Sequence, residues 1–293
     1  MTRLVIAFSC LLLAGLAVAG RANAMVDERD VARMVSFGGN CIKCDLSGRK
    51  LTGASFAGAR FTGAVLVATD LRGAAFIGSN FEDAQLMRAD LRGATIAGSN
   101  FSGADFTRAA LDGVEAPGTI FTRANFTGAS LTGAEMPGAI LTLANLTGAR
   151  FDGAEAPMAK MIQVNGRGAD FTQADLDGAL LVSSRFDRAS FRGASLDGAV
   201  LSGSVFYGAD FTNADLDGAV LAGADLSGAR GLRQSQLEDA CGDGGTRLPA
   251  GLKVRTCRRV SIIRVPQLPA PPAPPAPPPS APRATAPSRV AGG

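Results

Sequence analysis

Hydrophobic residues recur at every fifth position from Leu46 to Leu226, and the register of this pattern never slips. Leu or Phe occupies nearly all of these central positions, a small residue (most often Ala) lies two positions before each centre, and Gly commonly lies two after it. A period of five fits neither the 3.6 residues per turn of an α-helix nor the two-residue alternation of a flat strand. It fits a chain that turns a corner every five residues, with the centre and the small residue pointing inward. The pattern therefore predicts a repetitive solenoid.

Residues 224–229, Ala-Asp-Leu-Ser-Gly-Ala, are one of many copies of this motif. Over roughly residues 45–230 the chain resembles the pentapeptide-repeat family. The resemblance implies an all-β fold, a right-handed quadrilateral β-helix with four repeats per coil. A period of twenty agrees with it, because one column of centres is uniform: Leu51, Leu71, Leu91, Leu111 and Leu131, continued by Phe151, Phe171, Phe191 and Phe211.

Roughly nine coils at the strand spacing of about 4.8 Å predict a rod about 45 Å long. Gly suits its corners because it tolerates backbone angles that other residues avoid. Stacked Leu, Phe and Ala predict an interior without polar groups. Gly166 keeps the register but lacks a large side chain, so we expect a kink or bulge there.

The two ends of the chain differ from the repeats. Arg3, the apolar run 4–19 and the small-x-small sequence 22–24 are typical of a secretory signal cleaved after Ala24. The ends of a solenoid need caps, and we expect short helices over 27–35 and 234–240. The predicted organisation is a signal peptide (1–24), an N-terminal helical cap (25–44), the β-helix (45–230), a C-terminal cap with a disulfide loop (231–257) and a basic, disordered Pro-rich tail (258–293).

Four cysteines remain after cleavage, an even number in an oxidising compartment. We predict two structural disulfides that staple the ends, Cys41 with Cys44 and Cys241 with Cys257. The alternative for the Cys-x-x-Cys pair is a redox or zinc motif, but no nearby His or second close Cys pair completes a metal site. The expected location is periplasmic or secreted, with no stable membrane span after cleavage.

The chain contains no His, which removes the commonest general base and the commonest metal ligand. We therefore expect no enzyme, no cofactor and no metal site. Charge is unevenly distributed: residues 45–230 carry 15 basic and 20 acidic side chains, whereas residues 231–293 carry 9 and 3. An acidic body with a basic tail describes the chain better than its net charge of +3.

Eight carboxylates recur at a spacing of twenty on one side of the predicted rod. They form a candidate acidic interaction face: Glu115, Glu135, Glu155, Asp175, Asp177, Asp197, Asp215 and Asp217. The hypotheses are a surface for cations or a basic partner, or a contribution to solubility alone, with relief from nearby arginines at 185, 188 and 192. We expect the prolines at 117, 137 and 157 to interrupt hydrogen bonding between coils on this side.

Aliphatic residues occupy outward positions on the next side of the rod, and their register argues against chance. The candidate apolar interface consists of Ile120, Ile140, Ile162, Leu180, Val182, Val200 and Val220. Such a stripe reaches the size at which exposed apolar patches usually mean contact. Two alternatives could cover this stripe: the segment 260–265 of the same chain, or a second copy of the chain in a two-fold dimer.

Three Asn-x-Ser/Thr sequences begin at Asn100, Asn125 and Asn145, and we interpret them as products of the repeat rather than as glycosylation sites. The sequence therefore predicts a non-catalytic structural or protein-interaction module of the bacterial cell envelope. Protein partners or self-association are expected, and nucleic acid is not. The family resemblance offers an alternative, because some cytoplasmic members mimic DNA and bind type II topoisomerases. A third, weaker hypothesis is an enzyme built on exposed carboxylates.

Overall fold

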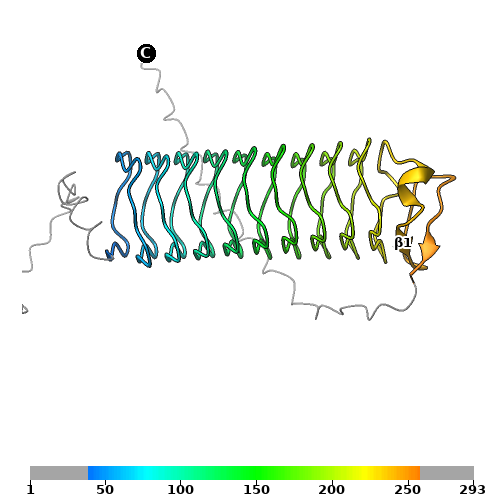
Figure 1. Ribbon diagram of the computed structural model, residues 1–293, viewed down its shortest axis with the longest axis horizontal. Helices are drawn as coiled ribbons and strands as arrows, with labels where there is room; N and C mark the ends of the chain where they lie inside the picture. Colours follow the sequence, from blue (N-terminus) through cyan, green and yellow to red (C-terminus); the bar gives the residue numbers. More distant parts are fainter. Residues whose placement is uncertain (1–38, 258–293) are drawn as a thin grey trace, which may run out of the picture. The chain divides into compact units, whose positions relative to one another are not determined.

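The computed structural model describes residues 39–257, which form a β-helix solenoid (Figure 1). From Asn40 with Arg60 to Asp210 with Arg230, isolated parallel bridges join residues that precede the centres to the residues twenty positions later. One coil therefore contains four five-residue repeats, and the coils stack into a rod. The predicted period of twenty is confirmed, and the stack already includes Cys41, a buried centre.

Three backbone hydrogen bonds per repeat connect neighbouring coils. Around Leu71, the amide of Asp70 donates to the carbonyl of Arg49 (2.9 Å), that of Leu71 to Asp90 (2.7 Å) and that of Gly73 to Arg92 (3.0 Å). A fourth bond closes the corner within the repeat, from the next amide back to the carbonyl of the centre (3.0 Å). Throughout the described repeats, the amide directly after the centre takes no part in this ladder.

This pattern corrects the expectation for the prolines. Each of the three lies directly after a centre, where the missing N–H has no role between coils. The amide of Gly98 still donates to Pro117 (3.0 Å), and that of Gly118 donates to Pro137 (2.9 Å). The acidic side is therefore as regular as the others.

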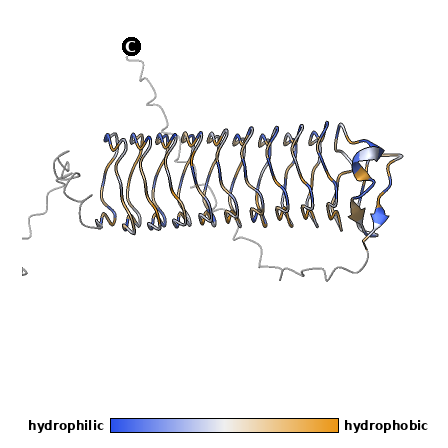
Figure 2. Cartoon of the chain, viewed as in Figure 1, coloured by the Kyte–Doolittle hydropathy of each residue, from blue (hydrophilic) through white to orange (hydrophobic). Residues whose placement is uncertain are grey.

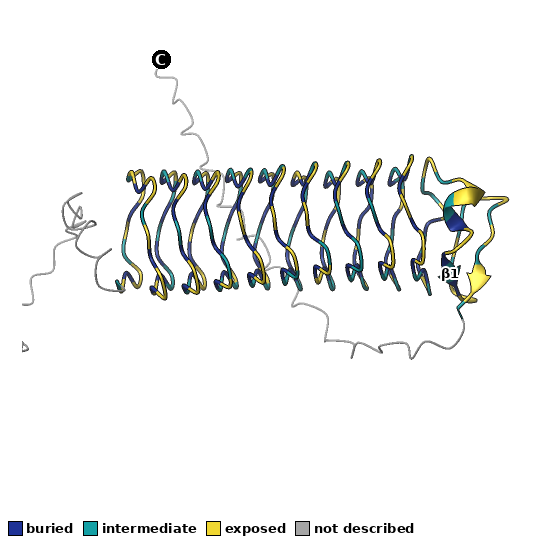
Figure 3. Cartoon of the chain, viewed as in Figure 1, coloured by how far each residue is buried: buried dark blue, intermediate teal, exposed yellow. Residues whose placement is uncertain are grey.

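The centres and the small residues before them fill the interior (Figure 3). Along each coil, hydrophobic and hydrophilic residues follow one another closely, as Figure 2 shows. Phenylalanine rings stack from coil to coil, and the ring centroids of Phe61 and Phe81, and of Phe81 and Phe101, are 4.6 Å apart. Stacked and edge-on aromatic pairs add to the free energy gained by burial.

The interior is not wholly apolar, so that prediction was wrong. Hydroxyl side chains replace Ala two residues before some centres: Thr69, Ser79, Ser99, Thr119, Ser184 and Ser204 are all buried. The hydroxyl of Ser79 donates to the carbonyl of Phe56 (2.8 Å) and accepts from the amide of Ala59 (3.1 Å). A small hydroxyl is tolerated because the backbone of the preceding coil supplies both partners.

No kink or bulge occurs at Gly166, contrary to expectation. Asn165 bridges both Asn145 and Arg185 in the normal register. The ring of Phe186 uses the space, because a Cβ atom on Gly166 would lie 2.4 Å from Phe186 Cδ1. The absent side chain at one centre is thus compensated by the ring stacked one coil later.

The C-terminal end of the rod is closed by η1 (Gln234–Leu237), a 3-10 helix, and by a parallel pair of strands, β1 (Cys241–Gly242) and β2 (Arg255–Thr256). Leu237 is buried. The Gln236 side chain donates to the carbonyls of Phe211 (2.9 Å) and Ala214 (2.6 Å), so it caps acceptors of the last coil. The predicted helix over 234–240 is therefore a single turn.

The helix predicted over 27–35 and the tail 258–293 lie outside the described residues. Among residues 39–257 no helix combines the length and the apolar character that a membrane crossing requires.

We predict that Gly166→Ala lowers the free energy of unfolding by about 1–3 kcal/mol, the usual range for overpacking a core. Denaturant unfolding measures this, and the loss should shrink in a Phe186→Leu background, where the ring is gone. Gly148→Ala is the control, because a Cβ there meets open space and only the positive φ of 64° is costly. An equal loss with and without the ring would contradict the steric explanation.

Candidate interaction surfaces

Each coil has four sides, and each side carries two outward columns, one before and one after its centres. We number the sides by their centres: side 1 from Leu51 to Phe211, side 2 from Phe56 to Leu216, side 3 from Phe61 to Leu221 and side 4 from Leu46 to Leu226, each in steps of twenty. Because the ladder fixes the spacing, residues twenty apart are neighbours on the surface.

The acidic face lies on side 2 as two columns rather than one. Bridges link Glu115, Glu135, Glu155 and Asp175 in successive coils, and the same column continues through Ser195 to Asp215. The remaining carboxylates follow the centres and form the second column: Asp177, Asp197 and Asp217. The glutamates are exposed, whereas Asp175 and Asp177 are half-buried.

The short aspartate side chains are held by the backbone. Asp175 Oδ1 accepts the amide of Asp177 (3.0 Å), and Asp177 Oδ1 accepts the amide of Asp197 (3.2 Å) and the hydroxyl of Ser195. An aspartate can reach the amide two residues on, as in an Asx-turn. The aspartates of both columns therefore also stabilise the backbone turns.

Two of the three arginines expected to relieve this face pair elsewhere. Arg185 lies 3.0 Å from Asp187, and Arg192 lies 3.3 Å from Asp210. The reason is geometric, because both arginines extend from sides other than side 2.

Sequence reasoning missed the end of the acidic face. A hollow of about 220 Å³ is lined by Asp215, Asp217, Ser235, Gln236, Glu238 and Asp239. The last four residues come from the C-terminal cap, which no repeat pattern positions. Between residues 39 and 257, no group of three or more Asp, Glu, Cys or His side chains is arranged to share a metal ion.

The apolar stripe lies on side 3, also as two columns. Bridges connect Ile120 to Ile140 and connect Leu180, Val200 and Val220 in series. Ile162 and Val182 follow their centres on the same side. All seven residues are half-buried. Lys160 is exposed and interrupts the column between Ile140 and Leu180.

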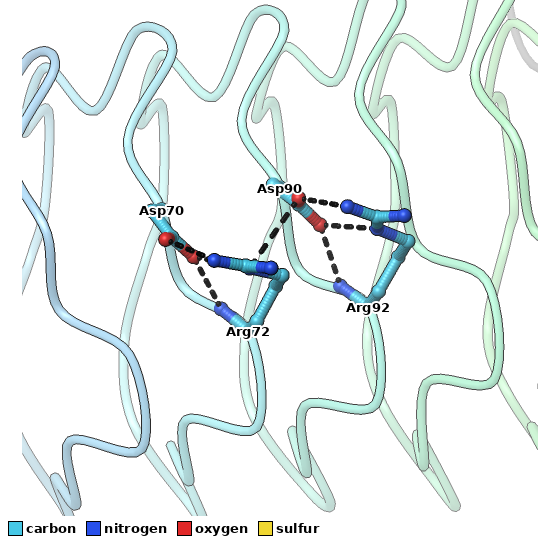
Figure 4. A network of polar contacts seen from close by, with 4 residues as sticks. All are labelled: Asp70, Arg72, Asp90 and Arg92. Carbon is cyan, nitrogen blue, oxygen red and sulfur yellow. Dashed lines mark hydrogen bonds and ion pairs between the residues drawn. The ribbon is translucent and has the colours of Figure 1, made fainter.

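Side 1 carries an ion-pair ladder that sequence reasoning did not single out (Figure 4). Arg72 donates to Asp70 through Nε (2.9 Å) and Nη2 (2.8 Å), and its Nε lies 3.7 Å from Asp90. Arg92 contacts Asp90 in the same manner. The signal was an Asp-Leu-Arg sequence repeated after twenty residues. Hydrogen bonds from Arg72 hold the pKa of Asp70 far below its usual value, and those from Arg92 lower the pKa of Asp90.

Side 4 carries an asparagine ladder. The amide of Asn125 donates to Thr107 (2.9 Å), and that of Asn145 donates to Thr127 (3.0 Å) and to the carbonyl oxygen of Asn125 (3.2 Å). Side-chain amides bonded in this way join coils. The geometry favours the structural interpretation of the Asn-x-Thr sequences at Asn125 and Asn145.

The structure contains both predicted disulfides. Cys41 pairs with Cys44 in the first coil, with Cα atoms 5.3 Å apart, and Cys241 pairs with Cys257 at 4.8 Å. The second bond ties β1 to the residue after β2, next to Val220, which bridges Cys241.

We predict that Arg72→Gln lowers the melting temperature at pH 7 and that this loss shrinks as the pH falls towards 2. The folded pKa values of Asp70 and Asp90 lie below the unfolded value of about 3.9. Their stabilisation is therefore complete above about pH 4 and is lost as the pH falls through the folded values. Melting curves from pH 7 to pH 2 test this, with Arg123→Gln on a corner as the control. A difference that persists unchanged at pH 2 would contradict the ion-pair explanation.

The family model for pentapeptide repeats matches eight copies in overlapping segments between residues 40 and 241. Among solved structures, HetL from the cyanobacterium Nostoc sp., a pentapeptide repeat protein involved in heterocyst differentiation regulation, is 28% identical with a TM-score of 0.59, over 75% of this chain and 98% of HetL. Full-length QnrB1, a plasmid-mediated fluoroquinolone resistance protein, is 22% identical over 70% of this chain and 94% of its own, with a TM-score of 0.25. At that identity the likeness concerns the fold alone. No curated protein sequence matches the chain.

Proposed function

The chain belongs to the pentapeptide-repeat family, and on this premise we propose that it is a non-catalytic structural or protein-interaction module of the bacterial cell envelope. Proteins of this family are generally not enzymes. The observation that carries the proposal is the stacking of like side chains in register on the outside of the rod, acidic on side 2 and aliphatic on side 3. Such columns present a long patterned surface, and a macromolecular partner fits it better than a small substrate.

The rigidity of the backbone supports a binding role for these columns. Three hydrogen bonds per repeat fix the outward residues at a spacing of about 4.8 Å. Because the backbone that carries the glutamates on side 2 is already fixed by its coils before any partner arrives, binding loses less backbone conformational entropy. We propose a basic protein segment as the partner of side 2, since an extended row of carboxylates suits an extended row of Lys or Arg.

The proposal includes the right-handed sense of the β-helix, as the family resemblance implies. It also includes export from the cytoplasm. Export is supported by the signal-like sequence before Ala24 and by the two cysteine pairs placed for disulfide formation, which is typical of oxidising compartments.

The alternative is DNA mimicry directed at a type II topoisomerase, and the acidic columns are the observation that favours it. Such a target lies in the cytoplasm, so the compartment distinguishes the two functions.

We predict that the native protein is found in the periplasm or outside the cell and begins at Met25. Fractionation of the native host followed by intact-mass measurement tests this. A cytoplasmic product that retains residues 1–24 would overturn the envelope role and favour the topoisomerase alternative.

We also predict that replacing Glu115, Glu135 and Glu155 together by Gln preserves the fold and weakens binding to a basic partner at least tenfold. The binding of the unmodified protein should fall steeply with salt, because the charges are exposed. Cross-linking in envelope extract identifies the partner, and binding to that purified partner is then measured. Glu82→Gln is the control, since this exposed glutamate follows the centre Phe81 on side 3. Equal binding by the triple variant and the control would leave solubility as the role of this column.

A further inference from the structure

The apolar stripe on side 3 has an acidic rim on one flank and a basic rim on the other. We propose that two copies of the chain associate side by side, parallel to each other, through side 3. This inference rests on the proposed interaction role and names one partner, a second copy.

The stripe is densest between residues 180 and 220. Leu180, Val200 and Val220 lie in consecutive coils, and Val182 lies beside Leu180 across the centre Leu181. These side chains point away from a filled interior, since Leu181 itself is fully buried. Half-exposed aliphatic columns on a flat strand surface gain most when a matching column covers them.

Two-fold symmetry allows two arrangements of side 3 against itself. With the symmetry axis along the rod, the rods are parallel and the column before the centres faces the column after the centres of the partner. Leu180 then meets Val182 of the second copy, twice. With the axis across the rod, the rods are antiparallel and each column faces itself in reverse, so an axis level with the middle of the stripe brings Lys160 against Leu180.

The rims decide between the two arrangements. The chain reaches side 3 from side 2, where Asp177 and Asp197 lie one residue before the corner glycines. It leaves side 3 towards side 4, where Arg185 precedes the centre Phe186 and forms the basic rim. Arg185 lies 3.0 Å from Asp187, which follows that centre and is also 3.7 Å from Arg167, so the two arginines leave a net positive charge around Asp187.

Parallel rods place the acidic rim of one copy opposite the basic rim of the other. Arg185 lies between Asp177 and Asp197 along the chain, less than one coil from either, so the opposite charges meet at nearly the same height. Antiparallel rods would instead place acid against acid. Electrostatic complementarity therefore selects the parallel pair.

The expected association is weak. A stable interface buries about 800 Å² per partner, whereas an exposed stripe of this kind offers a few hundred Å². The dimer should therefore depend on protein concentration, and charge reversal at the rims should be sufficient to dissociate it.

Sedimentation equilibrium of the protein from Met25 onwards, the predicted mature form, tests the association. The average mass should rise with concentration from that of one such chain towards twice that value. Asp177→Arg with Asp197→Arg, and separately Arg167→Asp with Arg185→Asp, should each give monomers, whereas an equimolar mixture of the two variants should again form dimers. Asp112→Arg with Asp152→Arg on side 1 is the matched control and should leave the dimer intact.

Cross-linking tests the direction. In parallel rods Thr142→Cys lies near its own counterpart, so a short bis-maleimide should join two copies; Thr132→Cys, the equivalent position on side 1, should give no product. A dimer that Thr142→Cys does not cross-link overturns the parallel arrangement.

A chain that stays monomeric at all concentrations overturns the dimer. If Val200→Lys then lowers the melting temperature only while residues 258–293 are present, that segment is the occupant instead. A monomer found in the envelope would leave the proposed function standing.

Discussion

Backbone hydrogen bonds between residues about twenty apart determine everything else in this rod. They require each coil to repeat the path of the one before, so a side chain at one position has the equivalent residue of the next coil as its neighbour. Inside, this turns single Leu and Phe residues into continuous stacks. Outside, it turns a local preference for Asp, Asn or Val into a column. Residues twenty apart in the sequence therefore become neighbours on the surface. The acidic, aliphatic, ion-pair and asparagine columns all follow from the requirement that each coil repeats the path of the one before.

The period and the closed interior could be predicted from the sequence because both are carried by side-chain size alone. The two cysteine pairs could be predicted because the rod keeps its ends apart. The errors share a different cause. Whether a proline costs a hydrogen bond depends on which amide the ladder uses, and whether Ser79 can be buried depends on the carbonyl of Phe56 one coil earlier. Neither fact is visible without the backbone path. The effect of Gly166 likewise depended on Phe186, twenty residues away.

The surfaces show the same division. The residues of each candidate face lie on one side of the rod, but each group splits into two columns separated by a centre. This separation sets what a partner can contact. The ion pairs of Arg72 with Asp70 and of Arg92 with Asp90 lie within single repeats and were missed although the Asp-Leu-Arg sequence recurs after twenty residues. The amide ladder through Asn145 was missed because it joins residues on the same side of different coils. The hollow lined by Glu238 and Asp239 belongs to the cap, whose sequence carries no period.

The amide left out of the ladder after each centre has a consequence for how such rods evolve. At that position the fold asks for no donor, which is why Pro117 and Pro137 are accommodated without local disruption. Where the residue before the centre is Asp or Asn, its side chain accepts this amide instead, as Asp175 does for Asp177. In each repeat the residue after the centre can therefore vary freely. An Asp or Asn before the centre can fix the local turn by accepting the free amide. Outward residues can therefore be substituted during evolution, one column at a time, while the backbone hydrogen bonds and the buried interior stay the same.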